Sequence, residues 1–410
     1  MPTQYPSLIH LFCRQSWVTA IQSRMKRHPQ GFYLLCLAVL CERWAAAILA
    51  SSLVFMLCEQ YGHSLGEALR LSGLYNAASY FLTLPGGFAI DRVLGARRSI
   101  GAGMALLTCG YAALTIPLPS VLWLSAPLLL FGHALFKPSA QAVLVLLYER
   151  HDRRLDGAQI AIYLVINIAV TIGSICAGLL ILRHDFRACF TLAASVLLLG
   201  TLAVFLGKTI LLLRTKQPAF STAMSMSPIA LSSLQRVQRI AALTLAMLLF
   251  AIGSGQVDGS LLLWARDRTD RVLLSFEIPA AWFVGLPALL VLILAPAQLV
   301  LLPRLQQRTS TPRLIAWGLI AVALAFAVLI PPALLFPGQR LSMLWLLASM
   351  TLLVTGELLV SPLGLSLLLR LAPPRFVGVV LGAWYVAGSL GCWLAGELGA
   401  LWMDPTMRRK

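Results

Sequence analysis

Long apolar runs separated by short polar segments organise the whole chain. Runs of about twenty apolar residues are long enough to cross a bilayer as a helix, and the sequence contains eleven such runs. Their approximate bounds are 31–58, 69–90, 99–117, 121–147, 158–182, 188–212, 240–264, 279–302, 314–337, 341–369 and 376–401. The pattern predicts an all-α, polytopic membrane protein.

One connecting segment is longer than the others and divides the runs into two sets. It holds Lys216, a proline and a run rich in Ser and Met. We therefore predict two helix bundles joined by a linker. The expected parts are an N-terminal cytoplasmic segment 1–30, a six-helix bundle 31–213, a cytoplasmic linker 214–239, a second bundle 240–401 and a basic tail 402–410.

Composition supports the membrane assignment, and the placement of charge gives an orientation. The chain is 59% hydrophobic and 11% charged, whereas soluble proteins average about 45–50% and about 25%. With the N-terminus in the cytoplasm, twenty Lys and Arg fall on the cytoplasmic side and seven on the other, which follows the positive-inside rule. The net charge of +17 therefore indicates membrane topology, with lipids and not nucleic acid as partners.

Several classes of chemistry lack their sequence signals. The eight Cys are scattered and form no CxxC pair, and 1–29 has no apolar stretch typical of a cleavable signal peptide. No HExxH, GxSxG or GxxxxGK[ST] sequence occurs. We expect neither an enzyme nor an ATP-driven pump, and no metal or cofactor.

Six charged residues are candidates for membrane depth: Glu42, Arg43, Lys137, Asp258, Glu357 and Glu397. Charge in hydrocarbon is costly and usually serves transport. Glu42 and Arg43 lie inside the first apolar run, and the alternative interpretation is a pair snorkelling to the membrane face. Because direct neighbours on a helix do not share a face, we expect the two to engage different partners.

Two runs, one in each half, combine a charge with a proline. Lys137 precedes Pro138, and Glu357 lies five residues before Pro362, next to Ser361. Paired Pro/Gly-interrupted helices indicate the midplane site of a transporter. The alternative is that Lys137 and Glu357 pair as a structural bridge between the halves.

Among the acidic residues in or near the apolar runs, Glu42 and Asp258 are candidate proton carriers. Glu42 is a candidate proton carrier, because burial favours the neutral acid and a basic neighbour favours the carboxylate. Asp258 lies in the polar patch 253–260 and is either a second proton site or part of a solvated turn. Glu397 lies near the end of its run, which favours an interfacial position.

Two short motifs complete the candidates. Residues 86–98 contain Gly86, Gly87, Asp91 and Arg92, which suit a hinge or gate with close helix contact. Tyr163 and Asn167 lie at i and i+4 on one helix face, suited either to a polar substrate or to an interhelical hydrogen bond. The tyrosines at 75 and 80 are less specific candidates.

These residues resemble the proton-dependent oligopeptide transporter (POT or PTR) family of the major facilitator superfamily. The resemblance covers about 31–398 and runs in order. Its blocks are the loop at 86–95, Phe136-Lys137-Pro138, the stretch Tyr163 to Asn167, the stretches 264–271 and 276–283, and the stretch 356–366 followed by Leu371-Ala372-Pro373.

The resemblance implies a major-facilitator-like two-bundle fold and symport of di- and tripeptides with protons by alternating access. It implies that Lys137 and Arg43 face the peptide carboxylate and Glu357 its amino terminus. Glu42 would belong to the proton-coupling motif, and Asn167, Tyr75, Tyr163 and Ser361 to the peptide site. We expect a monomer in the bacterial inner membrane, driven by the proton gradient alone.

The chain also departs from the family pattern. Val39 stands where the first motif Glu is expected, and Ala50 and Gly255 replace a family salt bridge. Pro287 replaces an asparagine, and the chain ends where a twelfth helix is expected to begin. Two alternatives therefore remain: a divergent member that carries another small solute or is uncoupled from protons, and a non-transporting or decayed membrane protein.

Overall fold

The computed structural model describes residues 28–148, 154–207, 232–373 and 377–403, most of them helical. The first half contains α2 (Gln30–Glu59), α3 (Leu65–Phe81), α4 (Thr83–Ala89), the π-helix η2 (Ile90–Leu94), α5 (Ala96–Leu114), α6 (Pro119–Leu146), α7 (Arg154–Ile181) and α8 (Phe186–Leu206). The second contains α10 (Ser233–Ser254), α11 (Ser260–Asp267), α12 (Trp282–Arg308), α13 (Thr311–Ala327), α14 (Ile330–Leu335), α15 (Met343–Leu371) and α16 (Val377–Met403). The predicted segment 1–30, linker 214–239 and tail 402–410 lie largely outside these residues.

The apolar runs become long helices, as the sequence predicts. Eight helices in the described residues are long and apolar enough to cross a membrane, and the bent helix α12 makes up to nine. The second and third predicted spans correspond to α3 with α4 and to α5. With α10–α11 and α13–α14 each taken as one span, the described helices supply all eleven predicted segments.

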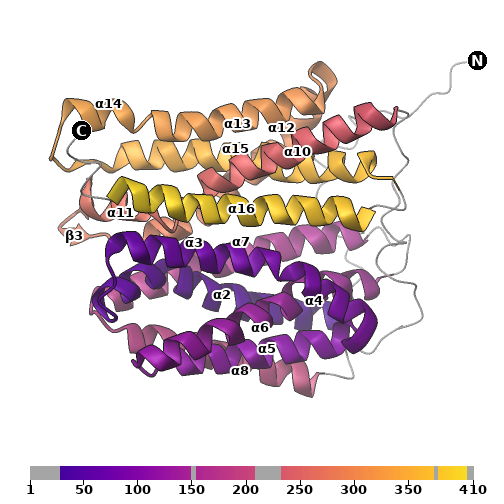
Figure 1. Cartoon of the computed structure of the whole chain (residues 1–410), viewed down its shortest axis with the longest axis horizontal. Coiled ribbons are helices and arrows are strands. Elements are labelled where there is room, and N and C mark those ends of the chain that lie inside the picture. Colours follow the sequence, from indigo (N-terminus) through magenta and orange to yellow (C-terminus); the bar gives the residue numbers. More distant parts are fainter. Residues whose placement is uncertain (1–27, 149–153, 208–231, 374–376, 404–410) are drawn as a thin grey trace, which may run out of the picture.

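The helices form two halves that meet along two helix pairs (Figure 1). In the first half α5 packs on α6, and α2 packs on α7 and α8. In the second, α15 packs on α13, and α10 packs on α16 and α15. The halves join where α3 lies along α16 and α7 along α12, so those two pairs are where relative motion of the halves must be accommodated.

Short loops and small strands lie at the end of the bundle where α2 finishes, which we call the far end. Here β1 (Thr269–Asp270) pairs in parallel with β4 (Leu341–Ser342), and β2 (Val272–Leu273) pairs with β3 (Phe276–Glu277) in a hairpin. The helix α3 also starts here, with a capping box in which Ser64 and Glu67 exchange hydrogen bonds. The bond from the Ser64 backbone lowers the pKa of the Glu67 carboxyl.

Glycines bring the two halves into backbone contact in the far half of the bundle. A Cβ built on Gly73 of α3 would lie 2.6 Å from Gly396 Cα of α16, and one on Gly178 of α7 would lie 2.3 Å from the Trp282 ring of α12. Trp282 Nε1 also donates to the carbonyl oxygen of Ile175 at 3.0 Å. The halves are therefore in close contact on both sides at this end.

Candidate functional site

Glu42 and Arg43 lie near the middle of α2 and pair with each other. The Glu42 side chain is 1% exposed, and the Arg43 guanidinium donates hydrogen bonds to both of its carboxylate oxygens. The prediction that these neighbours engage different partners is wrong. The long arginine side chain folds back, and a buried carboxylate without a partner is costly, so the nearest cation is retained.

The alternative of snorkelling does not describe this pair. The Arg43 side chain turns to Glu42 in the interior, yet it is still 23% exposed. A cation that is held within the bundle and remains partly accessible can meet a dissolved solute. This arrangement is the one expected for a charge that lines a transport route.

The helix α6 brings two more basic groups to the same place. His133 and Lys137 lie one turn apart on one face, and His133 Nδ1 is 2.8 Å from Glu42 Oε1. Lys137 Nζ donates to Ser79 Oγ at 2.7 Å and lies 5.4 Å from the centre of the Tyr80 ring. We call Glu42, Arg43, His133 and Lys137 the α2–α6 cluster.

Glu357 of α15 is a charged group of the second half, and it is not part of the α2–α6 cluster. Lys137 bonds to Ser79 and not to Glu357, so the structural bridge considered from the sequence is not formed. Within the described residues Glu357 has neither an ion pair nor a hydrogen bond, although the phenols of Tyr80 and Tyr163 lie within its electrostatic reach. An unpaired acid near two tyrosines is available to a cationic ligand.

The polar pair on α7 is bonded within its own helix. Asn167 is buried, at 7% exposed, and its side-chain amide donates to the carbonyl oxygen of Tyr163 on the same helix at 2.8 Å. Among the described residues this amide makes no interhelical hydrogen bond. Tyr163 is 39% exposed, and Ser361 of α15 is half-buried, so both are accessible for contact.

Asp258 lies at the break between α10 and α11 and is bonded across the interface between the halves. Asn76 Nδ2 of α3 donates to Asp258 Oδ2 at 2.9 Å. The neighbouring Gln256 donates to the carbonyl oxygen of Ala395 in α16 at 3.0 Å. The turn predicted here exists, but its carboxylate joins α3 to the second half and is not simply solvated.

The predicted hinge residues Pro138 and Gly86 both affect the carbonyl of Ala134. Pro138 lacks an N–H, which leaves the Ala134 carbonyl without its helical partner, although α6 continues through the proline. A Cβ built on Gly86 would lie 2.0 Å from that same carbonyl oxygen, whereas one on Gly87 would meet nothing within 4 Å. Close helix contact therefore requires Gly86 and not Gly87.

In the second half, the carbonyl that the proline frees accepts a side-chain hydrogen bond. Pro362 lies inside the continuous helix α15 and frees the carbonyl of Leu358. Gln298 Nε2 of α12 donates a hydrogen bond to this carbonyl oxygen. The bond secures the residue next to Glu357 along the chain.

The other residues of the predicted hinge lie at the opposite end from the far end. Asp91 belongs to η2, but its side chain lies outside what the structure describes. Arg92 is exposed and lies 5.7 Å from the centre of the Phe88 ring. A role in gating stays a prediction for all of these residues.

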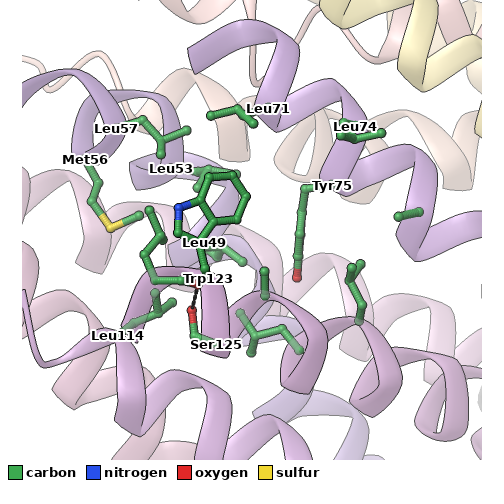
Figure 2. A pocket seen from close by; sticks show the side chains of 15 residues that line it. Leu49, Leu53, Met56, Leu57, Leu71, Leu74, Tyr75, Leu114, Trp123 and Ser125 are labelled. Carbon is green, nitrogen blue, oxygen red and sulfur yellow. Dashed lines mark hydrogen bonds between the residues drawn. The ribbon is translucent and has the colours of Figure 1, made fainter. Parts of the chain in front are cut away.

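An apolar pocket of about 190 Å³ lies between α2, α3, α5 and α6 (Figure 2). Leu49, Leu53, Leu71 and Trp123 are among its lining residues, and Tyr75 forms one wall. Tyr75 is also within electrostatic reach of Glu42 and Arg43. At this volume, below the roughly 300–1,000 Å³ of small-molecule sites, the pocket does not enclose a whole substrate.

Some residues at the site carry signals that the sequence analysis did not use. His133 precedes Lys137 by four residues, which is the spacing of one helix face. Gln298 is an isolated polar residue in the apolar run of α12. Ser79 and Asn76 flank a stretch of alanines in α3, and nothing in the sequence distinguishes them as contacts of Lys137 and Asp258.

The chain matches a family model described as Major Facilitator Superfamily over residues 35–396. It is 26% identical to the peptide transporter YePEPT of Yersinia enterocolitica, over 91% of this chain and 88% of the relative. It is 27% identical to dipeptide and tripeptide permease A of Chromobacterium violaceum, over 92% and 86%. A crystal structure of a peptide transporter POT in complex with sulfate superimposes with a TM-score of 0.86 at 24% identity, covering 94% of this chain and 91% of that one.

The match over most of the chain shows that this protein belongs to the Major Facilitator Superfamily. It is thus an integral membrane transporter and not an enzyme. Within the superfamily its relatives and structural neighbours are those of the POT family, which confirms the family predicted from the sequence.

Proposed function

We propose that the protein is a proton-coupled symporter of di- and tripeptides that works by alternating access. One observation carries the proposal: cationic Arg43 and Lys137 lie in one half, and the unpaired Glu357 lies in the other. A short peptide has a carboxylate at one end and an ammonium at the other, so it can engage both halves at once. The names of the sequence relatives support a peptide as the substrate.

In this proposal each charged group has a separate task. Lys137 and Arg43 bind the peptide carboxylate, and Glu357 binds the amino terminus. Asn167, Tyr75, Tyr163 and Ser361 contact the rest of the peptide, and Glu42 with Asp258 serves proton coupling. No cofactor is required, since the proton gradient supplies the free energy.

The orientation belongs to the proposal as well. The excess of Lys and Arg on one side of the spans favours a cytoplasmic N-terminus. The relatives compared above are bacterial proteins, which supports the bacterial inner membrane. We further propose that the protein acts as a monomer.

Uptake of labelled dialanine into proteoliposomes under an imposed pH gradient tests the proposal. We expect accumulation that is lost in Lys137→Ala and in Glu357→Gln. Glu42→Gln should abolish driven accumulation and retain counterflow, because it removes coupling and not binding. Absence of pH-dependent uptake in the unaltered protein would contradict peptide symport.

A second candidate, carriage of another small solute or transport without protons, is favoured by the departures on α2 and α10. Val39 is buried and apolar where the family has an acid. At Gly255 a Cβ would lie 2.8 Å from the Ala395 Cβ, so this position serves helix packing. Counterflow that proceeds normally while the pH gradient drives no accumulation would favour this candidate.

A further inference from the structure

His133 is a buried titratable group of the α2–α6 cluster to which the proposed function assigns no task. Its side chain is 4% exposed, and its Nδ1 is 2.8 Å from Glu42 Oε1. An imidazole at the centre of a membrane bundle is rare, and ionisable groups there usually serve ion or substrate movement. It also lies on the helix that carries Lys137.

The charged and titratable groups that face His133 come from three other helices as well as its own. Glu42 and Arg43 belong to α2, and Lys137 lies one turn further along α6. Tyr75 of α3 and Tyr111 of α5 lie within electrostatic reach of the Glu42–Arg43 pair. His133 is therefore in an acid–base cluster and not in an apolar core.

Glu42 lies beside one ring nitrogen of His133, and the ring can still take up one proton. His133 Nδ1 is 2.8 Å from Glu42 Oε1 but makes no hydrogen bond of good geometry within the described residues. A neutral imidazole has one unprotonated ring nitrogen, which can accept one further proton. The carboxylate then stabilises the imidazolium, just as it stabilises Arg43.

We propose that His133 binds the coupling proton, and that Glu42 serves coupling by holding the His133 imidazole in place and not by being protonated itself. One N–H bond forms at the unprotonated ring nitrogen of His133 when a proton enters from one side of the membrane. The same bond breaks when the proton leaves on the other side, so one proton moves for each cycle and no other bond changes. This assignment rests on the proposed function.

Coupling follows from the charge of the cluster. When ionised, Glu42, Arg43 and Lys137 sum to one net positive charge, and an imidazolium at His133 adds a second. A substrate carboxylate therefore binds more tightly to the protonated cluster. By linkage the bound carboxylate favours the proton to the same extent, which is the cooperativity a symporter requires.

The test measures the KM of dialanine counterflow in proteoliposomes at equal pH on both sides, from about pH 5.5 to about pH 8.5. In the unaltered protein KM should rise with pH, by up to about tenfold per unit for one linked proton. His133→Gln should make KM independent of pH and abolish accumulation driven by a pH gradient. His63→Gln, at a histidine in the far-end loop, is the matched control and should retain the pH dependence.

A pH dependence of KM that persists in His133→Gln overturns the assignment. If that variant does not fold, His133→Asn takes its place. Failure of the unaltered protein to exchange dialanine at any pH would instead contradict the proposed function. In that case ¹⁵N-histidine NMR of the unaltered protein tests the inference separately. The signal altered by Glu42→Gln should show a change of protonation state as the pH is lowered, and a constant protonation state overturns the inference.

Discussion

The two halves of the bundle carry their charges in opposite ways. In the first half Glu42, Arg43, His133 and Lys137 lie together, and each contacts a polar or ionic partner. In the second half Glu357 stands without an ion pair within the described residues. The difference fits the division of tasks in the proposed function, in which the first half binds the peptide carboxylate and Glu357 gains its partner with the substrate.

The largest effect should follow from removing a partner inside the first half. Arg43→Ala leaves the buried Glu42 carboxylate with only His133, and breaking a buried ion pair costs about 3–5 kcal/mol. We expect a large loss of thermal stability in detergent as well as loss of uptake. Glu42→Gln made together with Arg43→Ala should recover much of the stability, because it removes the orphaned charge. Equal stability of Arg43→Ala and the unaltered protein would contradict the ion-pair interpretation.

Neutralising the acid of the second half should impair transport without lowering stability. Glu357→Gln removes no partner, so we expect an unchanged or higher melting temperature. Transport should fall, since loss of one charge-assisted contact of roughly 1.5–3 kcal/mol reduces affinity about tenfold to a hundredfold. Glu397→Gln, at an acid whose side chain is 34% exposed, is a matched control. If Glu357→Gln lowered the melting temperature and left dialanine affinity normal, Glu357 would have a structural role and not a binding role.

Each half contains a backbone carbonyl that a proline leaves without its helical partner, and the contacts of these two carbonyls can be tested separately. Gly86→Ala should destabilise the protein by about 1–3 kcal/mol, because its Cβ would overlap the Ala134 carbonyl oxygen. Gly87→Ala, one residue away and with open space around it, should be neutral. Thermal denaturation of the two variants in the same detergent measures the difference, and equal losses would show that the contact does not require glycine.

The corresponding change in the second half is Gln298→Leu. It removes the donor to the Leu358 carbonyl, and a buried acceptor left unsatisfied costs about 1–3 kcal/mol. We expect a moderate fall in melting temperature together with weaker dialanine binding, because Glu357 is adjacent to Leu358. Gln298→Glu should not rescue either property, since a carboxylate cannot donate. A melting temperature unaffected by Gln298→Leu would refute the role of this bond.

The smallest effect is expected at the exposed pair between the halves. Arg70 Nε lies 3.2 Å from Glu397 Oε2, and the two side chains are 50% and 34% exposed. Surface ion pairs contribute about 0–1 kcal/mol. Arg70→Gln should therefore change the melting temperature little at any salt concentration, whereas a large, salt-dependent loss would show that this pair holds the halves together.

Apolar run length predicts the fold well, because the bilayer sets the length of a spanning helix. Lys137, Pro138, Glu357 and Pro362 stand out in the sequence because such residues are rare within apolar runs, and each lies within a continuous helix of the bundle. The sequence alone does not predict which groups meet between helices. The bond of Lys137 to Ser79 and the approach of Gly86 to Ala134 depend on how α3, α4 and α6 are rotated.

The error at Arg43 has a physical cause that applies more widely. The rule that adjacent helical residues point apart concerns Cβ directions, whereas an arginine side chain is long enough to turn back. In water the gain from doing so is small. In a desolvated interior the nearest opposite charge becomes the preferred partner, so burial must be known before the rule is applied.

The close contact of Gly73 with Gly396 has a consequence for how the protein responds to its surroundings. Backbone packing between glycines depends on dispersion over short distances, so neither ionic strength nor external acidity changes it appreciably. The nearby Arg70–Glu397 pair is exposed and adds little. Ionic strength and acidity should therefore affect this glycine contact far less than they affect the buried charges of the α2–α6 cluster.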